Sequence, residues 1–212
     1  MSLRRLPVYV LADCSGSMTG APIESVKSGI RELHNELMGD PQSIECAFLS
    51  VITFDSEAKQ LVPLTELGSF SPPDLEASGT TSLGAALTLL KERIENEVNK
   101  TTEEQKGDWK PLVFLLTDGA ATDDWEAAAD TIKQTVSCTI ICVACGEGAE
   151  ADQLKRVSDT VLVMKDMSPD AFAAFFKWVS SSIKTHSAKA ATMKEDEVLE
   201  LPPAPAVITI HP

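Results

Sequence analysis

The sequence is poor in positive charge. Its 212 residues include 18 lysines and arginines against 32 aspartates and glutamates, which gives a formal net charge of −14. Non-specific binding to nucleic acids or to anionic membranes needs a basic face. We therefore expect no nucleic acid among the partners of this chain.

Long hydrophobic runs are also missing. No apolar stretch reaches the roughly 18–20 residues that a helix needs to cross a bilayer, so no membrane insertion is expected. The first residues, MSLRRLPVYVLADC, are similar to a signal peptide, but their apolar stretch is short. Asp13 also stands where processing needs a small neutral residue. We expect Leu6–Ala12 to form a first strand and the protein to be cytoplasmic.

Histidine and cysteine are scarce, with three and five residues respectively. No histidine is placed to activate a hydroxyl or a thiol, so a serine or cysteine nucleophile is not supported. The odd number of cysteines does not suit a full disulfide framework and fits a reducing compartment. Cys142 and Cys145 form a CxxC on a predicted strand, where they would point to opposite faces. We expect two buried cysteines there and no zinc site.

Strand-like and helix-like segments alternate along the chain. Short runs rich in apolar and β-branched residues predict six strands, which are LPVYVLAD, ECAFLSVITFD, KQLVPLT, PLVFLLTDG, CTIICVACG and TVLVMK. Helices are predicted where apolar residues recur every three or four positions, as in Ile23, Val26, Ile30, Leu33 and Leu37.

This alternation implies parallel βαβ units. The second and third strands would pair as an antiparallel hairpin, with Pro63 confining the third to an edge. The predicted fold class is α/β: a Rossmann-like, doubly wound, mostly parallel six-stranded sheet with one antiparallel edge strand and helices on both faces.

The composition changes after about Thr185. The remaining segment, HSAKAATMKEDEVLELPPAPAVITIHP, has charge runs, small residues and four prolines. We expect residues 6–185 to form one domain and residues 186–212 to form an acidic, proline-rich tail. A disordered end is the simpler interpretation. The alternative is that AVITI adds a strand to a sheet edge, in this chain or in another.

Three groups of oxygen-bearing side chains occur at or near the ends of predicted strands, where doubly wound sheets bind ligands. They are Asp13 with Ser15 and Ser17 after the first strand, Thr80-Thr81 ahead of a helix, and Thr117-Asp118-Gly119 at the end of PLVFLL. If the first strand and the PLVFLL strand are neighbours, Asp13 and Asp118 meet at one edge. The serines and one threonine would then complete a ring of oxygens.

Such a ring has the chemistry of a hard-metal site. It contains carboxylates and hydroxyls without imidazole or thiolate, which suits Mg²⁺, Ca²⁺ or Mn²⁺ and disfavours zinc or copper. Two carboxylates can balance a divalent charge, and the set leaves room for water or an incoming carboxylate. Taken alone, Asp13, Ser15 and Ser17 could also form a polar turn with helix caps.

DCSGS, the threonine of GTTSLG, and LLTDG together resemble the metal-ion-dependent adhesion site of von Willebrand factor A domains. The resemblance extends from Leu6 to about Thr185. It implies that Asp13, Ser15 and Ser17 are direct or water-mediated ligands of a Mg²⁺ ion, with Ca²⁺ or Mn²⁺ as alternatives. It further implies Thr81 as the ligand threonine, with Thr80 as the runner-up, and Asp118 as a carboxylate that often acts through water. The implied partner is an acidic residue of another protein.

Three longer stretches, RRLPVYVLADCSGSM, VITFDSEAKQLVPLTEL and PLVFLLTDG, are similar to the TerY group of bacterial tellurite-resistance loci. That resemblance implies a non-catalytic binding module in stress-response phospho-signalling, with a protein kinase or a PP2C-type phosphatase as candidate partners. A metal-dependent phosphatase or hydrolase is one alternative, although Ser15 stands where aspartyl-phosphate enzymes carry a second carboxylate. A structural scaffold with a vestigial site is the other.

Overall fold

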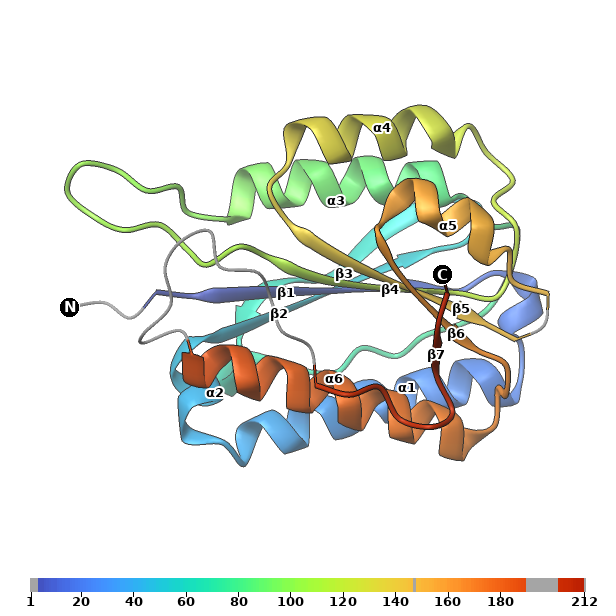
Figure 1. Ribbon diagram of the computed structural model, residues 1–212, viewed down its shortest axis with the longest axis horizontal. Helices are drawn as coiled ribbons and strands as arrows, with labels where there is room; N and C mark the ends of the chain where they lie inside the picture. The colour runs from blue at the N-terminus through green and yellow to red at the C-terminus, as the bar shows by residue number, and fades with distance from the viewer. Residues whose placement is uncertain (1–3, 147, 190–201, 212) are drawn as a thin grey trace.

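The computed structural model describes residues 4–146, 148–189 and 202–211, and a single sheet runs through its centre (Figure 1). The strand order is β3-β2-β1-β4-β5-β6-β7. The strands are β1 (Leu6–Asp13), β2 (Ala47–Phe54), β3 (Ala58–Glu66), β4 (Leu112–Thr117), β5 (Thr139–Cys145), β6 (Thr160–Met164) and β7 (Thr209–Ile210). The inner pairings are parallel, whereas β3 and β7 pair antiparallel at the two edges.

Helices cover both faces of the sheet (Figure 1). One face carries α1 (Ala21–Met38), α2 (Pro41–Cys46) and α6 (Pro169–Lys189). The other carries α3 (Leu83–Glu97), α4 (Trp125–Thr135) and α5 (Ala151–Val157). Two 3₁₀ turns, Gly16–Met18 and Leu67–Ser69, complete the regular structure of the described residues. Within that part of the chain, no helix has both the length and the apolar character needed to cross a membrane.

The covered sheet explains why the inner strands are continuously apolar in sequence. All eight residues of β1 are buried. Alternate side chains enter different cores, so Val8 and Val10 pack with α1 and α6, whereas Tyr9 and Leu11 pack with α3 and α4. Cys142 and Cys145 likewise belong to opposite cores, and all five cysteines are free, as the sequence predicts.

The predicted α/β fold is confirmed, with two differences. The second strand begins at Ala47 because Glu45 and Cys46 belong to α2, whose first turn is capped by the carboxylate of Asp40 accepting the Ser43 N–H at 2.9 Å. The sheet also has seven strands where six were predicted, because AVITI contributes β7. The hairpin of β2 and β3 and the edge position of Pro63 are as expected.

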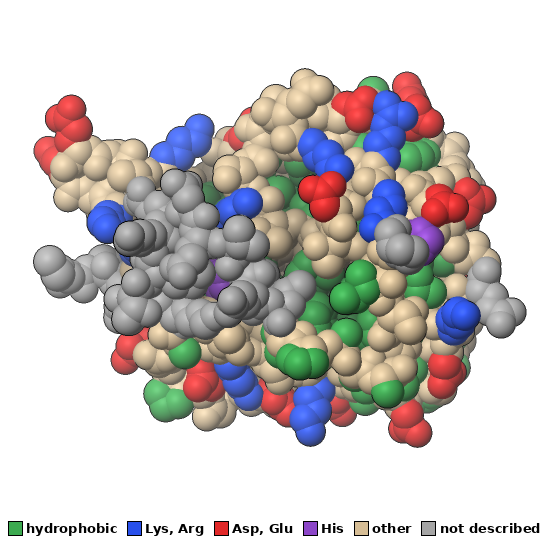
Figure 2. All heavy atoms as spheres, viewed as in Figure 1, with side chains coloured by type: hydrophobic (Ala, Val, Ile, Leu, Met, Phe, Trp, Pro, Cys, Tyr) green, Lys and Arg blue, Asp and Glu red, His purple; other side chains and the backbone are tan. Residues whose placement is uncertain are grey.

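Residues 202–211 lie against the domain. The Trp178 indole N–H of α6 donates to the carbonyl oxygen of Pro202 at 2.9 Å, and the His211 N–H donates to that of Val161 at 2.8 Å. Ile208 is buried in the core between them, with 4% of its surface exposed. Residues 202–211 therefore follow the second interpretation of the tail, because they add a strand to the sheet of this chain. Residues 190–201 lie outside the described part. Val207 and Ile210 remain exposed, and Figure 2 shows hydrophobic side chains gathered over this region.

Replacing Ile208 by alanine is expected to lower the free energy of unfolding by about 2 kcal/mol, because a buried aliphatic side chain is lost. Val207→Ala is the matched control, since Val207 is 39% exposed and should cost a few tenths of a kcal/mol. Urea denaturation of both variants measures the difference. Equal costs would mean that residues 202–211 do not pack on the domain in solution.

Candidate metal centre

Asp13 is the last residue of β1 and is fully buried at the carboxyl edge of the sheet. Its Oδ1 accepts the Ser15 N–H at 2.8 Å. Its Oδ2 accepts the hydroxyl of Thr117, the last residue of β4, at 2.5 Å. Because β1 and β4 are parallel neighbours, paired from Val8↔Leu112 to Ala12↔Leu116, their polar ends meet at one edge of the sheet.

Two serine hydroxyls connect Asp13 to Asp118. The Oγ atoms of Ser15 and Ser17 are 3.0 Å apart, and Ser17 Oγ donates to Asp118 Oδ1 at 2.8 Å. Ser15 is buried, whereas Ser17 is exposed and Asp118 is half-buried. The oxygens therefore form a continuous series that begins in the core at Asp13 and ends at the surface.

The structure distinguishes between the two candidate threonines. Thr81 is 6% exposed, and its Oγ1 lies 3.2 Å from the position that a Cβ on Gly119 would occupy, so it lies beside the residue that follows Asp118. Thr80 instead directs its Oγ1 toward Ser56 Oγ, 3.4 Å away, on the exposed side of the loop. The geometry favours Thr81 over Thr80 as the member of the site.

Backbone hydrogen bonds hold the three loops together. Gly16 N–H donates to the Gly79 carbonyl at 3.1 Å, which joins the loop after β1 to the loop before α3. Thr122 N–H donates to the Thr81 carbonyl at 2.9 Å, which joins that loop to the one after β4. The positions of the oxygen donors are thus fixed by the fold.

Asp123 has a role that its sequence position did not indicate. The sequence predicts a helix just after Asp123, so we expect this residue in the first turn of that helix. The alternative is that its carboxylate orients the metal ligands. Its carboxylate instead accepts the N–H groups of Gly84 and Ala85, each at 3.0 Å, at the start of α3. Asp123 therefore caps α3, the helix that follows Thr81. Its two partners are 39 and 38 residues away in the sequence, so no local pattern could reveal this contact.

The electrostatics of the centre favour a bound cation. Burial raises the pKa of Asp13, the hydrogen bonds from Thr117 and Ser15 oppose this, and the charge of Asp118 adds to it. Burial also raises the pKa of Asp118, against its hydrogen bond from Ser17. No lysine or arginine among the described residues forms an ion pair with either carboxylate.

The donor set fits a hard divalent ion. Within the described residues there is no cluster of three or more His, Cys, Asp and Glu side chains that could hold a metal. The centre has only two carboxylates, and its remaining donors are the hydroxyls of Ser15, Ser17 and Thr81. Carboxylate and hydroxyl oxygens suit Mg²⁺, Ca²⁺ or Mn²⁺, and they do not provide the nitrogen or sulfur ligands typical of structural zinc.

The protein is an α/β domain with a mostly parallel sheet and a cluster of oxygen-bearing side chains at the carboxyl edge of that sheet. The model of the von Willebrand factor type A domain family matches residues 8–176. The chain is therefore a member of that family.

Known proteins are similar to this chain in sequence or in fold. An uncharacterized protein of Synechocystis is 27% identical over 166 residues, which cover 73% of this chain and 36% of that protein. Proximal thread matrix protein 1 of the mussel byssus, in a structure with a zinc-occupied MIDAS motif, has 19% identity and a TM-score of 0.60, covering 85% of this chain and 48% of that one. The open conformation of the pilus adhesin SpaC of Lactobacillus rhamnosus GG has 14% identity and a TM-score of 0.69, covering 88% and 31%. This chain spans less than half the length of each, and the two structures support the fold alone.

Proposed function

We propose that this chain is a non-catalytic binding module that captures an acidic residue of a partner protein through a divalent cation. The ion would be held by Asp13, Ser15, Ser17, Thr81 and Asp118. The observation that carries the proposal is the convergence of these oxygens from three loops on one edge of the sheet, where the two carboxylates form no ion pair with a basic side chain of the described residues.

The exposure of the site supports a binding role. Asp13 and Ser15 are buried and would fix the inner side of the ion, whereas Ser17 is exposed and Asp118 is half-buried. A carboxylate of a partner can therefore approach from solvent. The bound cation would supply a positive charge with a coordination position for that carboxylate.

The choice of Mg²⁺, with Ca²⁺ or Mn²⁺ as alternatives, follows from the oxygen-only donor set. The mussel protein shows that a site of this family can be occupied by zinc. Titration of the purified protein with each of these four ions by calorimetry measures the preference directly. Tightest binding of zinc would contradict the proposed metal.

The two adjacent threonines provide a matched test of the site. Thr81→Val is expected to weaken Mn²⁺ binding by about 10-fold or more, because a hydroxyl donor is lost without change in shape. Thr80→Val, which removes a hydroxyl facing Ser56, should leave the affinity unchanged. Mn²⁺ binding measured by electron paramagnetic resonance compares the two variants. Equal affinities would exclude Thr81 from the ligand set.

The proposed biological setting is bacterial tellurite resistance and stress-response phospho-signalling in the cytoplasm, with a kinase or PP2C-type phosphatase as the partner. Its support is the similarity of three sequence stretches to the TerY group. The test is a pull-down of a purified kinase or phosphatase from such a locus, in Mg²⁺ and in EDTA, with wild type beside Thr81→Val. Binding that survives both EDTA and the substitution would contradict metal-mediated capture.

A further inference from the structure

A cavity of about 300 Å³ opens at the amino-terminal edge of the sheet, opposite the edge that carries Asp13. It lies where the ends of α3 and α4 meet the segment that leads into β4. Its apolar lining consists of Ile94, Val98, Trp109, Pro111 and Val136. Ile94 and Trp109 are 6% and 8% exposed, so the base of the cavity is continuous with the core.

The charged residues around the cavity leave an excess of positive charge. Lys100 and Lys110 both line it and are exposed, and neither forms an ion pair with a described residue. The acidic lining residues are already engaged. Glu95 pairs with Lys91 at 2.9 Å, and Asp108 pairs with Arg5. These two lysines, which pair with no described residue, place positive charge beside an apolar cavity in a chain of net charge −14.

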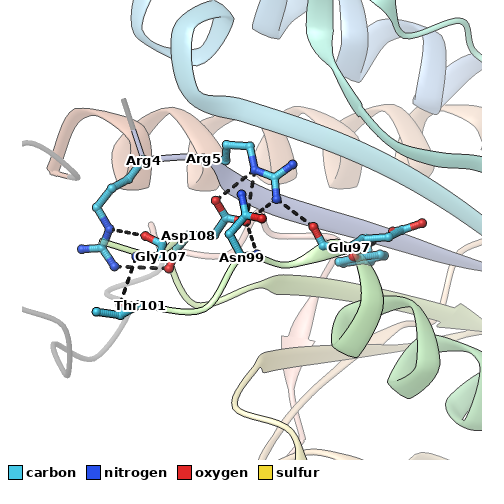
Figure 3. A network of polar contacts seen from close by, with 8 residues as sticks. Arg4, Arg5, Glu97, Asn99, Thr101, Gly107 and Asp108 are labelled. Carbon is cyan, nitrogen blue, oxygen red and sulfur yellow. Dashed lines mark hydrogen bonds and ion pairs between the residues drawn. The ribbon is translucent and has the colours of Figure 1, made fainter. Parts of the chain in front are cut away.

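One wall of the cavity is held rigidly by a polar network (Figure 3). Asp108 accepts three hydrogen bonds from Arg5, and its Oδ2 also accepts the Asn99 N–H at 2.7 Å. Arg4 donates to the Gly107 carbonyl at 2.7 Å, and its guanidinium lies 3.8 Å from the centre of the Trp109 ring. The segment between α3 and β4 is therefore tied to the start of β1. A preformed wall lowers the conformational cost of binding a ligand.

We propose that this cavity is a second ligand site, which takes a small anion with a flat apolar body, such as an aromatic carboxylate or sulfonate. The apolar lining would bury the body, and Lys100 and Lys110 would bind the anionic group. The volume is at the lower end of the roughly 300–1,000 Å³ of small-molecule pockets, which limits the ligand to a few fused or linked rings. The site needs no metal and is independent of the function proposed above.

The experiment uses the fluorescent anion 1-anilinonaphthalene-8-sulfonate, with the uncharged N-phenyl-1-naphthylamine as the matched probe, in EDTA. The folded wild-type protein should bind the anion at one site and the uncharged probe at least about tenfold more weakly. The double variant Lys100→Gln/Lys110→Gln should lose about tenfold or more in affinity for the anion. Lys106→Gln is the control, because Lys106 is on the same segment but does not line the cavity.

Two further measurements locate the bound anion. Val136→Phe places a larger side chain in the cavity from the carboxyl end of α4 and should abolish binding of the anion. In the wild-type protein, the Trp109 indole N–H resonance should shift when the anion is added. Asp13→Asn should bind the anion as the wild type does. Equal affinity in the wild type and the double lysine variant, equal affinity for the two probes, or an unmoved Trp109 resonance at saturation would each overturn the proposal.

Discussion

Replacing Asp13 by asparagine is expected to reduce Mg²⁺ affinity by at least about 100-fold. Asp13 is the innermost proposed ligand, and its loss removes half of the carboxylate charge of the centre. Substitution of residues that only orient metal ligands already lowers metal affinity by about 10–100-fold in other proteins. Calorimetric titration with Mg²⁺ or Mn²⁺ measures the change. Asp74→Asn is the control, because it removes one negative charge from an exposed side chain that pairs with Lys27 outside the centre.

The same substitution should not destabilise the protein in EDTA. Burial raises the pKa of Asp13 in the folded state. A carboxyl group with a raised pKa contributes stability at pH values below its unfolded pKa, and this contribution is lost as the pH rises through the folded pKa. At neutral pH the ionised Asp13 therefore costs stability, which asparagine avoids while it still accepts the Ser15 N–H.

Thermal unfolding of wild type and Asp13→Asn, each in EDTA and in Mg²⁺, separates the two effects. Mg²⁺ should raise the midpoint of the wild type only, because a ligand stabilises the state that binds it. In EDTA the variant should be as stable as the wild type or more stable. A variant that still gains stability from Mg²⁺ would exclude Asp13 as a ligand.

Replacing Gly29 by alanine is expected to cost about 2–3 kcal/mol of folding free energy, although alanine favours helices by about 1 kcal/mol over glycine. Gly29 lies in α1 where that helix crosses α6, and a Cβ there would lie 1.9 Å from Cδ2 of Phe176. Phe176 is 1% exposed and cannot turn away without opening the core. The two helices must therefore separate.

A double-mutant cycle in urea tests this cause. Phe176→Leu alone should destabilise the protein, but combined with Gly29→Ala it should cost less than the sum of the two changes, because the smaller side chain makes room for the methyl group. Ser28→Ala is the control, since Ser28 is an exposed neighbour on α1. Additive costs would contradict steric conflict with Phe176 as the cause.

Most of the fold could be predicted because its signals are local. The apolar runs of β1 and β4 and the three-and-four spacing in α1 each reflect burial against a covered sheet. The sequence also predicts the chemistry of the candidate metal centre, because residue types alone decide between hard and soft ligands. The start of the second strand is less clear from the sequence, because the helix that Asp40 caps extends over Glu45 and Cys46, which the sequence assigns to the strand.

The parts that could not be predicted depend on partners far away in the chain. Thr117 binds Asp13 across 104 residues, and Ser17 binds Asp118 across 101, so only the adjacency of β1 and β4 brings them together. The sequence alone does not decide that adjacency, and the structure shows it. The preference for Thr81 over Thr80 likewise depends on which hydroxyl faces Gly119.

The sequence by itself determined the classes of element, the apolar faces and the oxygen-bearing side chains that we propose as metal donors, because these follow from periodicity and side-chain chemistry within short windows. Tertiary structure decided the strand order, the seventh strand, the capping of α3 by Asp123 and the cavity that Lys100 and Lys110 help to line. Each of these requires segments separated by tens of residues to meet, and their meeting depends on how the whole core packs.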